Sequence, residues 1–264
     1  VFPLSSSSYL RLNGSKSDAG NYETGSGIKP LTEYSTTDYT AILGTILSDG
    51  SKLELNYTNN RQDKVGYPGL TMDIVYSYTD MYTLKYQRVT PFMFFSSMNI
   101  DLFNTDIDHL MDNVVLRGNS GNGVMAWPTA SDTYGGRLIG TIGSDMRTGI
   151  DYEHNRKDAE QYMVMSGSNT FLTYLWPGVE TEKLGIFFEK DLGNISYGLR
   201  YDQVELDPTK AADDAGGMMF KTANEVYTTD YDGTIVATKR EYDNISGFLR
   251  FTKDIDHGET YINL

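Results

Sequence analysis

The connections between the strand-like segments of this chain alternate strictly between short and long. Short joins such as Ser48–Gly50 and Asp191–Asn194 carry tight-turn residues. Long polar joins are expected between them, at about residues 14–33, 59–73, 108–131, 157–180 and 206–240. A soluble β-sandwich has no reason to alternate its connections in this way. A β-barrel that crosses a membrane does, because it has short turns on one side and longer loops on the other.

The segments between these joins show the two-residue period of β-strands, and helical periodicity is nearly absent. The last residues, Thr260–Leu264, stop in mid-strand, and an odd number of strands would leave an open edge. We therefore predict an all-β fold: an antiparallel transmembrane β-barrel that is partial, with about 11 strands inside a larger barrel. The predicted strands are approximately 4–13, 33–47, 51–59, 73–88, 91–107, 132–145, 147–157, 181–191, 194–206, 240–254 and 259–264.

Composition narrows the functional classes. The formal net charge of −14 argues against nucleic acid as a partner, because phosphate binding needs clustered Lys and Arg. The charge is compatible with attracting cations, but acidic, solvated loops are the simpler explanation and the one we favour. With no cysteine, the chain has no disulfide, Cys-zinc site or thiol nucleophile of its own.

Sequence motifs indicate neither a helical membrane span nor an enzyme. No run of 18 apolar residues and no signal peptide is present, and the start Val-Phe-Pro predicts a mature or internal fragment. The metalloprotease, serine-hydrolase and P-loop motifs are absent as well. We therefore expect a protein that works by binding rather than catalysis.

The stretch Val89–Arg117 contains the main candidate site. It opens with a turn at Pro91 and then alternates, so that His109 and Met111 would share the polar face just beyond the outer end of strand 91–107. Two positions apart on a strand, their Cα atoms would be about 6.6 Å apart. Imidazole with thioether favours Cu(I) over hard cations. The alternatives are packing at an internal interface, or two unligated loop residues.

Weaker candidates lie in the other long joins. Met72 and Asp73 could guide a metal toward the site as secondary residues, or could belong to a turn shaped by Pro68-Gly69, a type II signal. Thioethers that could collect copper, or merely fill gaps, occur at Met163, Met165, Met218 and Met219. His154 is predicted on the apolar face and His257 in a short turn.

Four segments resemble the barrel of TonB-dependent outer-membrane receptors, and most closely the copper-receptor branch of that family. They cover most of the chain in the expected order: Gly20–Gly25, Tyr67–Asp73, Asp108–Asn113 followed by Leu116-Arg117, and the pair Lys183–Glu189 and Tyr197–Asp202. The second and third segments are specific to the copper branch, whereas the last pair is common to receptor barrels generally.

The resemblance implies a 22-stranded barrel in the bacterial outer membrane, closed by an N-terminal plug and driven by the TonB complex of the inner membrane. Residues 1–264 would be a barrel fragment without that plug. In the copper branch a His-x-Met pair on the barrel is joined by a Cys and a Met of the plug. By this match, His109 and Met111 would bind copper, as Cu(I), that is being transported. The alternatives are a receptor for another metal or a metal chelate, or a passive porin or barrel adhesin.

Overall fold

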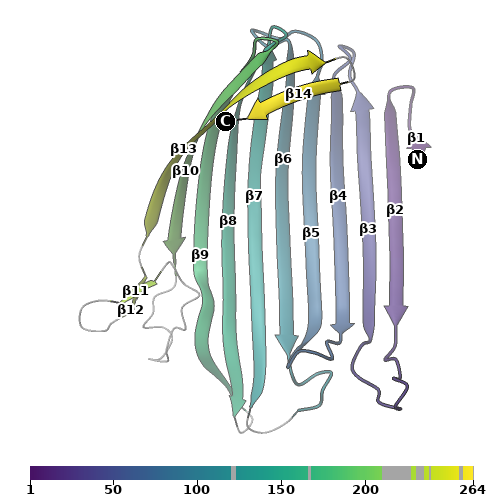
Figure 1. Ribbon diagram of the computed structural model, residues 1–264. Coiled ribbons are helices and arrows are strands. Elements are labelled where there is room, and N and C mark those ends of the chain that lie inside the picture. The colour runs from purple at the N-terminus through teal and green to yellow at the C-terminus, as the bar shows by residue number, and fades with distance from the viewer. Residues whose placement is uncertain are drawn as a thin grey trace.

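The fold of the chain is a single large antiparallel sheet, seen in the computed structural model of Figure 1. The structure describes residues 1–119, 123–165, 168–209, 227–229, 235–237, 239–255 and 258–263. The twelve strands of the sheet are β1 (Phe2–Pro3), β2 (Ser8–Ala19), β3 (Tyr34–Ile46), β4 (Lys52–Val65), β5 (Asp73–Arg88), β6 (Ser97–Asp112), β7 (Val124–Ile142), β8 (Met146–Met165), β9 (Ser168–Asp191), β10 (Ile195–Pro208), β13 (Arg240–Ile255) and β14 (Gly258–Asn263). A separate two-stranded sheet pairs β11 (Tyr227–Thr229) with β12 (Ile235–Ala237).

Each strand pairs with its neighbour in sequence, and only the step from β10 to β13 passes over the small sheet. The result is an up-and-down meander that curves as it proceeds (Figure 1). No helix among the described residues is long and apolar enough to cross a membrane. The all-β antiparallel fold predicted from the sequence is confirmed.

Connections at one end of the sheet are mostly short and those at the other mostly long, as the sequence predicts (Figure 1). Two connections break the predicted alternation: residues 89–96 join β5 to β6 at the short-turn end, and β9 begins only three residues after β8 ends at the other. Three of the short turns contain a glycine with positive φ: Gly50 (81°), Gly143 (64°) and Gly193 (83°). Glycine adopts this left-handed conformation without steric penalty, so these residues allow the chain to reverse at once. The end that carries the long connections, drawn at the bottom of Figure 1, is called the loop end below.

Strand lengths differ from the prediction at the loop end. The strand β5 has the predicted bounds, but β8 and β9 run through almost all of the predicted loop 157–180, and the connection after β6 shortens to 113–123. Hydrophobic alternation disappears where both faces of a strand are polar, although the backbone ladder continues. The sequence pattern therefore marks where the apolar face ends, not where the strand ends.

The start of β6 also differs. The predicted strand begins at Pro91, but β6 begins at Ser97. Phe92 and Phe95 instead exchange backbone hydrogen bonds of 2.9 and 3.0 Å, with Met93 between them at a φ of 56°. This small reversal takes the aromatic run out of the strand and lengthens a connection predicted to be tight.

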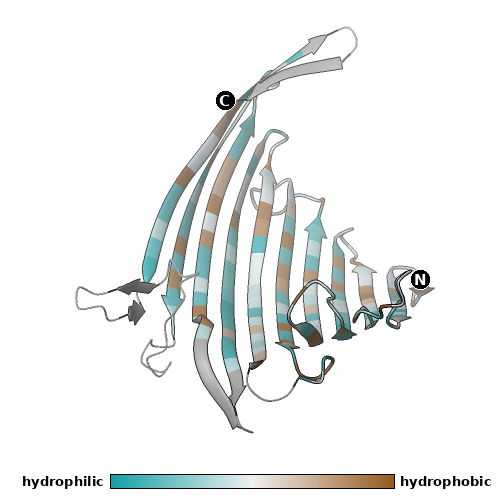
Figure 2. Ribbon diagram, turned by 60° about the horizontal axis from the view of Figure 1, so that its bottom comes forward, coloured by the Kyte–Doolittle hydropathy of each residue, from teal (hydrophilic) through white to brown (hydrophobic). Residues whose placement is uncertain are grey.

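The sheet has one apolar and one polar face. Five leucines from adjacent strands occupy one register row of the apolar face: Leu10, Leu43, Leu55, Leu84 and Leu102. Three of them, Leu43, Leu55 and Leu102, are about half exposed. Figure 2 shows the alternation of hydrophobic and hydrophilic residues along the strands. Only four hydrophobic residues of the described chain are buried, so no second layer covers this sheet.

The opposite, polar face carries charged side chains in register. Asp101, Arg137 and Asp151 are direct cross-strand partners on β6, β7 and β8. Opposite charges facing one another across strands stabilise the pairing of a sheet. A sheet with one exposed apolar face and one charged face fits the boundary between an apolar medium and water.

Candidate metal site at the loop end of the sheet

His109 and Met111 lie inside β6, close to its loop end. This corrects the prediction that they follow the strand, because β6 continues to Asp112. They have the same parity as Asp101, so both belong to the polar face. On β7 the register partner of His109 is Thr129, and that of Met111 is Trp127. The imidazole and the thioether are therefore neighbours on one face, as the sequence predicts.

The imidazole of His109 has an unused ring nitrogen. The residue is half-buried, and its Nε2 atom is buried with no hydrogen-bond partner in the part of the chain that the structure describes. Buried polar atoms normally have a partner, and an exception needs an explanation. A neutral imidazole nitrogen with a free lone pair is a metal ligand. This orphaned atom fits a metal ion as the missing partner.

An ion pair braces the chain next to these residues. Asp73, at the start of β5, is fully buried. Arg117 donates from Nε to its Oδ2 atom at 2.7 Å and from Nη2 to its Oδ1 atom at 3.0 Å. Arg117 Nη2 also donates to the Tyr67 carbonyl at 2.8 Å, and the Tyr67 amide donates to Asp73 Oδ1 at 2.8 Å. We call Tyr67, Asp73 and Arg117 the clasp, because they join the connections before β5 and after β6.

Two side chains shape the end of β6 itself. Asp112 Oδ1 accepts hydrogen bonds from the amides of Val114 and Val115, both at 3.0 Å. Asn113 accepts from the Met125 amide at 2.9 Å and donates to the Gly123 carbonyl at 3.0 Å. Asp112 and Asn113 are both buried. These bonds end β6 and start β7 at fixed positions, which sets the neighbours of Met111.

A third connection packs against the clasp. The Gly66 amide donates to the Glu33 carbonyl at 2.9 Å, and a Cβ on Gly66 would lie 2.7 Å from the backbone carbon of Leu31. Asn21 holds the same connection together by accepting from the amides of Thr32 and Glu33 at 2.6 and 2.9 Å. Three of the four segments that carry the family resemblance thus meet at this end of the sheet.

The secondary candidates have other surroundings. Met72 is buried, with 3% of its surface exposed, and the carboxylate of Asp73 is occupied by the clasp. This geometry favours the shaped turn over metal guiding. The turn is closed by a hydrogen bond from Leu70 N to Tyr67 O at 3.1 Å, but Gly69 lacks the positive φ of the predicted type II turn.

The other sulfur and imidazole candidates named from the sequence lie outside the described residues, on β8 or on the apolar face. Met218, Met219 and His257 lie outside the described residues, and Met163 and Met165 lie on β8. His154 belongs to the apolar face, where its ring stacks on Tyr134 with centroids 4.8 Å apart. Among the described residues, no three His, Asp or Glu side chains gather as a metal site. His109 and Met111 alone supply two ligands, so a metal site built on them would need further ones.

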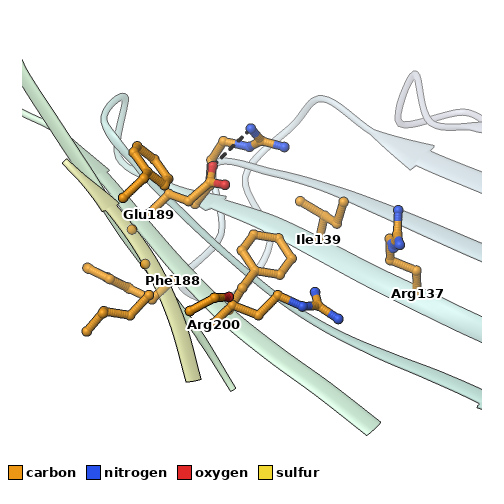
Figure 3. Close-up of a pocket in the computed structure, with 12 residues that line it drawn as sticks. Arg137, Ile139, Phe188, Glu189 and Arg200 are labelled. Carbon is orange, nitrogen blue, oxygen red and sulfur yellow. Dashed lines mark hydrogen bonds and ion pairs between the residues drawn. The ribbon is translucent and has the colours of Figure 1, made fainter. Parts of the chain in front are cut away.

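A hollow lined by charged and aromatic residues lies away from His109, beside β7 to β10 and β13. Figure 3 shows Arg137, Glu189 and Arg200 around it. Arg200 donates to both carboxylate oxygens of Asp151 at 2.9 Å, and its Nε donates to Asp202 at 2.8 Å. The guanidinium lies over Gly185, where a Cβ would be 2.1 Å from Nη2. This ion pair connects β8 to β10 across β9, and its role is to stabilise the sheet.

Sequence reasoning missed two residues of the site. Arg117 was noted only as part of a motif, and nothing in the sequence pairs it with Asp73, 44 positions earlier. Trp127 falls inside the predicted long join 108–131, but it pairs with Met111 on β7. The signal that could have found Trp127 is parity, because it shares the odd positions of Thr129 and Thr133.

The fold defines this chain as the wall of a partial antiparallel β-barrel. No protein-family model and no curated protein sequence matches it. Solved structures do: the copper transporter OprC, with a TM-score of 0.73 at 18% identity over 97% of this chain, and the ferric citrate transporter FecA in its unliganded form, with 0.62 at 13% over 97%. A third is the iron transporter FrpB from Neisseria meningitidis, with a TM-score of 0.57 at 12% identity over 99% of this chain.

The chain spans about two fifths of the length of these proteins: 40%, 38% and 42% respectively. At these identities the likeness establishes the fold. A partial barrel is consistent with this coverage and with the predicted fold class. All three proteins are transporters by name.

Proposed function

We propose that this chain forms part of the barrel of a TonB-dependent transporter in the bacterial outer membrane, and that the protein binds and imports copper. The apolar face would contact membrane lipid, and the polar face would line the lumen. The loop end would then face outward, because outer-membrane barrels have their long loops on the external side. His109 and Met111 would lie on the lumen side near that outer mouth.

The observation that carries the metal assignment is the buried, unpartnered Nε2 atom of His109 beside Met111. Thioether and imidazole together suit Cu(I), the soft ion, better than oxygen-preferring cations. The fold likeness to a copper transporter points the same way. Two ligands do not complete a site, so the others would come from a plug domain outside these 264 residues, which would also contact the TonB complex.

The second candidate is a receptor for iron or a metal chelate, because FecA and FrpB share the fold. Ferric iron prefers oxygen donors, so binding of iron or an iron chelate would gain little from the thioether of Met111. The two candidates therefore differ in their dependence on Met111.

Metal analysis of the full-length protein, plug included, tests the proposal. We expect bound copper in the wild type, and loss of that copper in the double variant His109→Ala, Met111→Ala. The matched control is His154→Ala, which removes an imidazole from the apolar face. Unchanged copper stoichiometry in the double variant would refute the assignment, and bound iron with no copper would favour the second candidate.

A further inference from the structure

Trp127 occupies the position next to the proposed metal ligands. It is the direct cross-strand partner of Met111, and it lies two positions from Thr129, the partner of His109. Directly opposed residues of antiparallel strands project to the same face, with Cβ atoms about 5 Å apart. His109, Met111 and Trp127 therefore adjoin one another on the polar face.

The backbone near Trp127 is fixed by hydrogen bonds, whereas its indole lacks one within the described part of the chain. Its Nε1 atom is buried with no partner among the described residues, like His109 Nε2. Asn113 fixes the start of β7 two residues earlier, through its side-chain bond to the Met125 amide and its backbone bond to the Met125 carbonyl at 3.2 Å. Trp127 cannot drift from Met111 without breaking these bonds.

We propose that Trp127 is a specificity-determining residue of the copper site: its indole covers the ion beside Met111 and favours monovalent over divalent copper. This inference rests on the proposed function. Indole has a single N–H donor and no lone pair to give a metal. It acts instead through its π face, by cation–π attraction and by contact with the thioether sulfur.

The preference for Cu(I) follows from what the indole excludes. Cu(II) takes a square-planar or tetragonal set of nitrogen and oxygen donors, which water can complete. An indole beside Met111 occupies one side of the ion without supplying a donor, and it keeps water away from that side. Cu(I) prefers the soft sulfur, so its binding affinity falls less than that of Cu(II) when that side of the ion carries no oxygen or nitrogen donor.

The test compares Trp127→Leu with the wild type in the full-length protein. Cu(I) affinity is measured by anaerobic competition with a chromophoric Cu(I) chelator, and Cu(II) affinity by a separate titration. We expect Trp127→Leu to weaken Cu(I) binding about 5- to 30-fold, the range of a desolvated cation–π contact. Cu(II) binding should stay unchanged, because leucine also keeps water away from that side of the ion. Trp176→Leu is the matched control, because it removes the other tryptophan of this chain, an exposed residue on β9.

A second variant and a second readout guard against misfolding. Trp127→Phe retains an aromatic ring with a weaker π face, so we expect a smaller loss of Cu(I) affinity than in Trp127→Leu. Cu(I) should also quench the part of the tryptophan fluorescence that Trp127→Leu lacks. Wild-type Cu(I) affinity in Trp127→Leu, with binding still lost in the His109, Met111 double variant, overturns this inference alone. Copper binding that survives the double variant overturns the proposed function instead.

Discussion

The clasp between Asp73 and Arg117 provides the sharpest test of how the candidate site is built. The perturbation is Asp73→Asn, which keeps the size of the side chain and removes its charge. An amide oxygen can still accept the hydrogen bond of the Tyr67 amide. The two charge-assisted bonds from Arg117, at 2.7 and 3.0 Å, lose their ionic character.

The magnitude follows from burial. Removing one partner of a buried ion pair typically costs about 3–5 kcal/mol, because the other charge stays buried without compensation. Asp73 is almost completely buried, whereas Arg117 keeps about a fifth of its side chain exposed. Partial solvation of the arginine puts the expected loss at the lower end, about 3 kcal/mol. That loss corresponds to a roughly 150-fold increase in the population of the locally opened state.

Hydrogen exchange of the full-length protein measures this opening directly. We expect amides in residues 66–72 and 113–119 to exchange about 150-fold faster in Asp73→Asn, and amides near the short turns to be unaffected. Asp106→Asn is the control, because Asp106 is exposed on β6. A double-mutant cycle with Arg117→Gln should give a coupling of about 2 kcal/mol. Exchange in Asp73→Asn equal to that in the control, or a coupling near zero, would refute the reasoning.

Two further predictions concern the loop packing and the apolar face. Gly66→Ala should lower stability by about 1–3 kcal/mol, because its Cβ would meet the Leu31 backbone, while Gly69→Ala, with open space around it, should stay within about 0.5 kcal/mol. Thermal unfolding in detergent compares them, and equal melting temperatures would contradict the close approach. Leu43→Arg should destabilise insertion into lipid vesicles by about 2–4 kcal/mol, while Ile42→Arg, at the preceding residue on the polar face, should be tolerated. Equal urea midpoints for the two arginine variants would show that the faces are misassigned.

Much of the fold is predictable from the sequence because it depends on local patterns. Period-two alternation places β5 at its observed bounds, and turn residues such as Ser48–Gly50 place the hairpins. The parity of His109 and Met111 follows from the same rule, since it needs no knowledge of distant residues. The predicted parity of His109 and Met111 is correct although the start of β6 was predicted six residues too early.

The parts that the sequence did not predict depend on distant contacts or on polar strand ends. Asp73 looks like a free acid in a polar loop until Arg117 is brought to it from 44 residues away. Gly66 shows no sign in sequence that it packs against Leu31. Strands β8 and β9 extend through polar residues, where hydrophobic alternation gives no signal, because backbone pairing there does not depend on an apolar face.

X-ray absorption of the copper-loaded, full-length protein tests the central claim most directly. We predict that imidazole nitrogen and thioether sulfur both contribute to the copper spectrum, and that His109→Ala with Met111→Ala removes one of each. A spectrum with only oxygen and nitrogen neighbours, or one that the double variant leaves unchanged, would contradict the account.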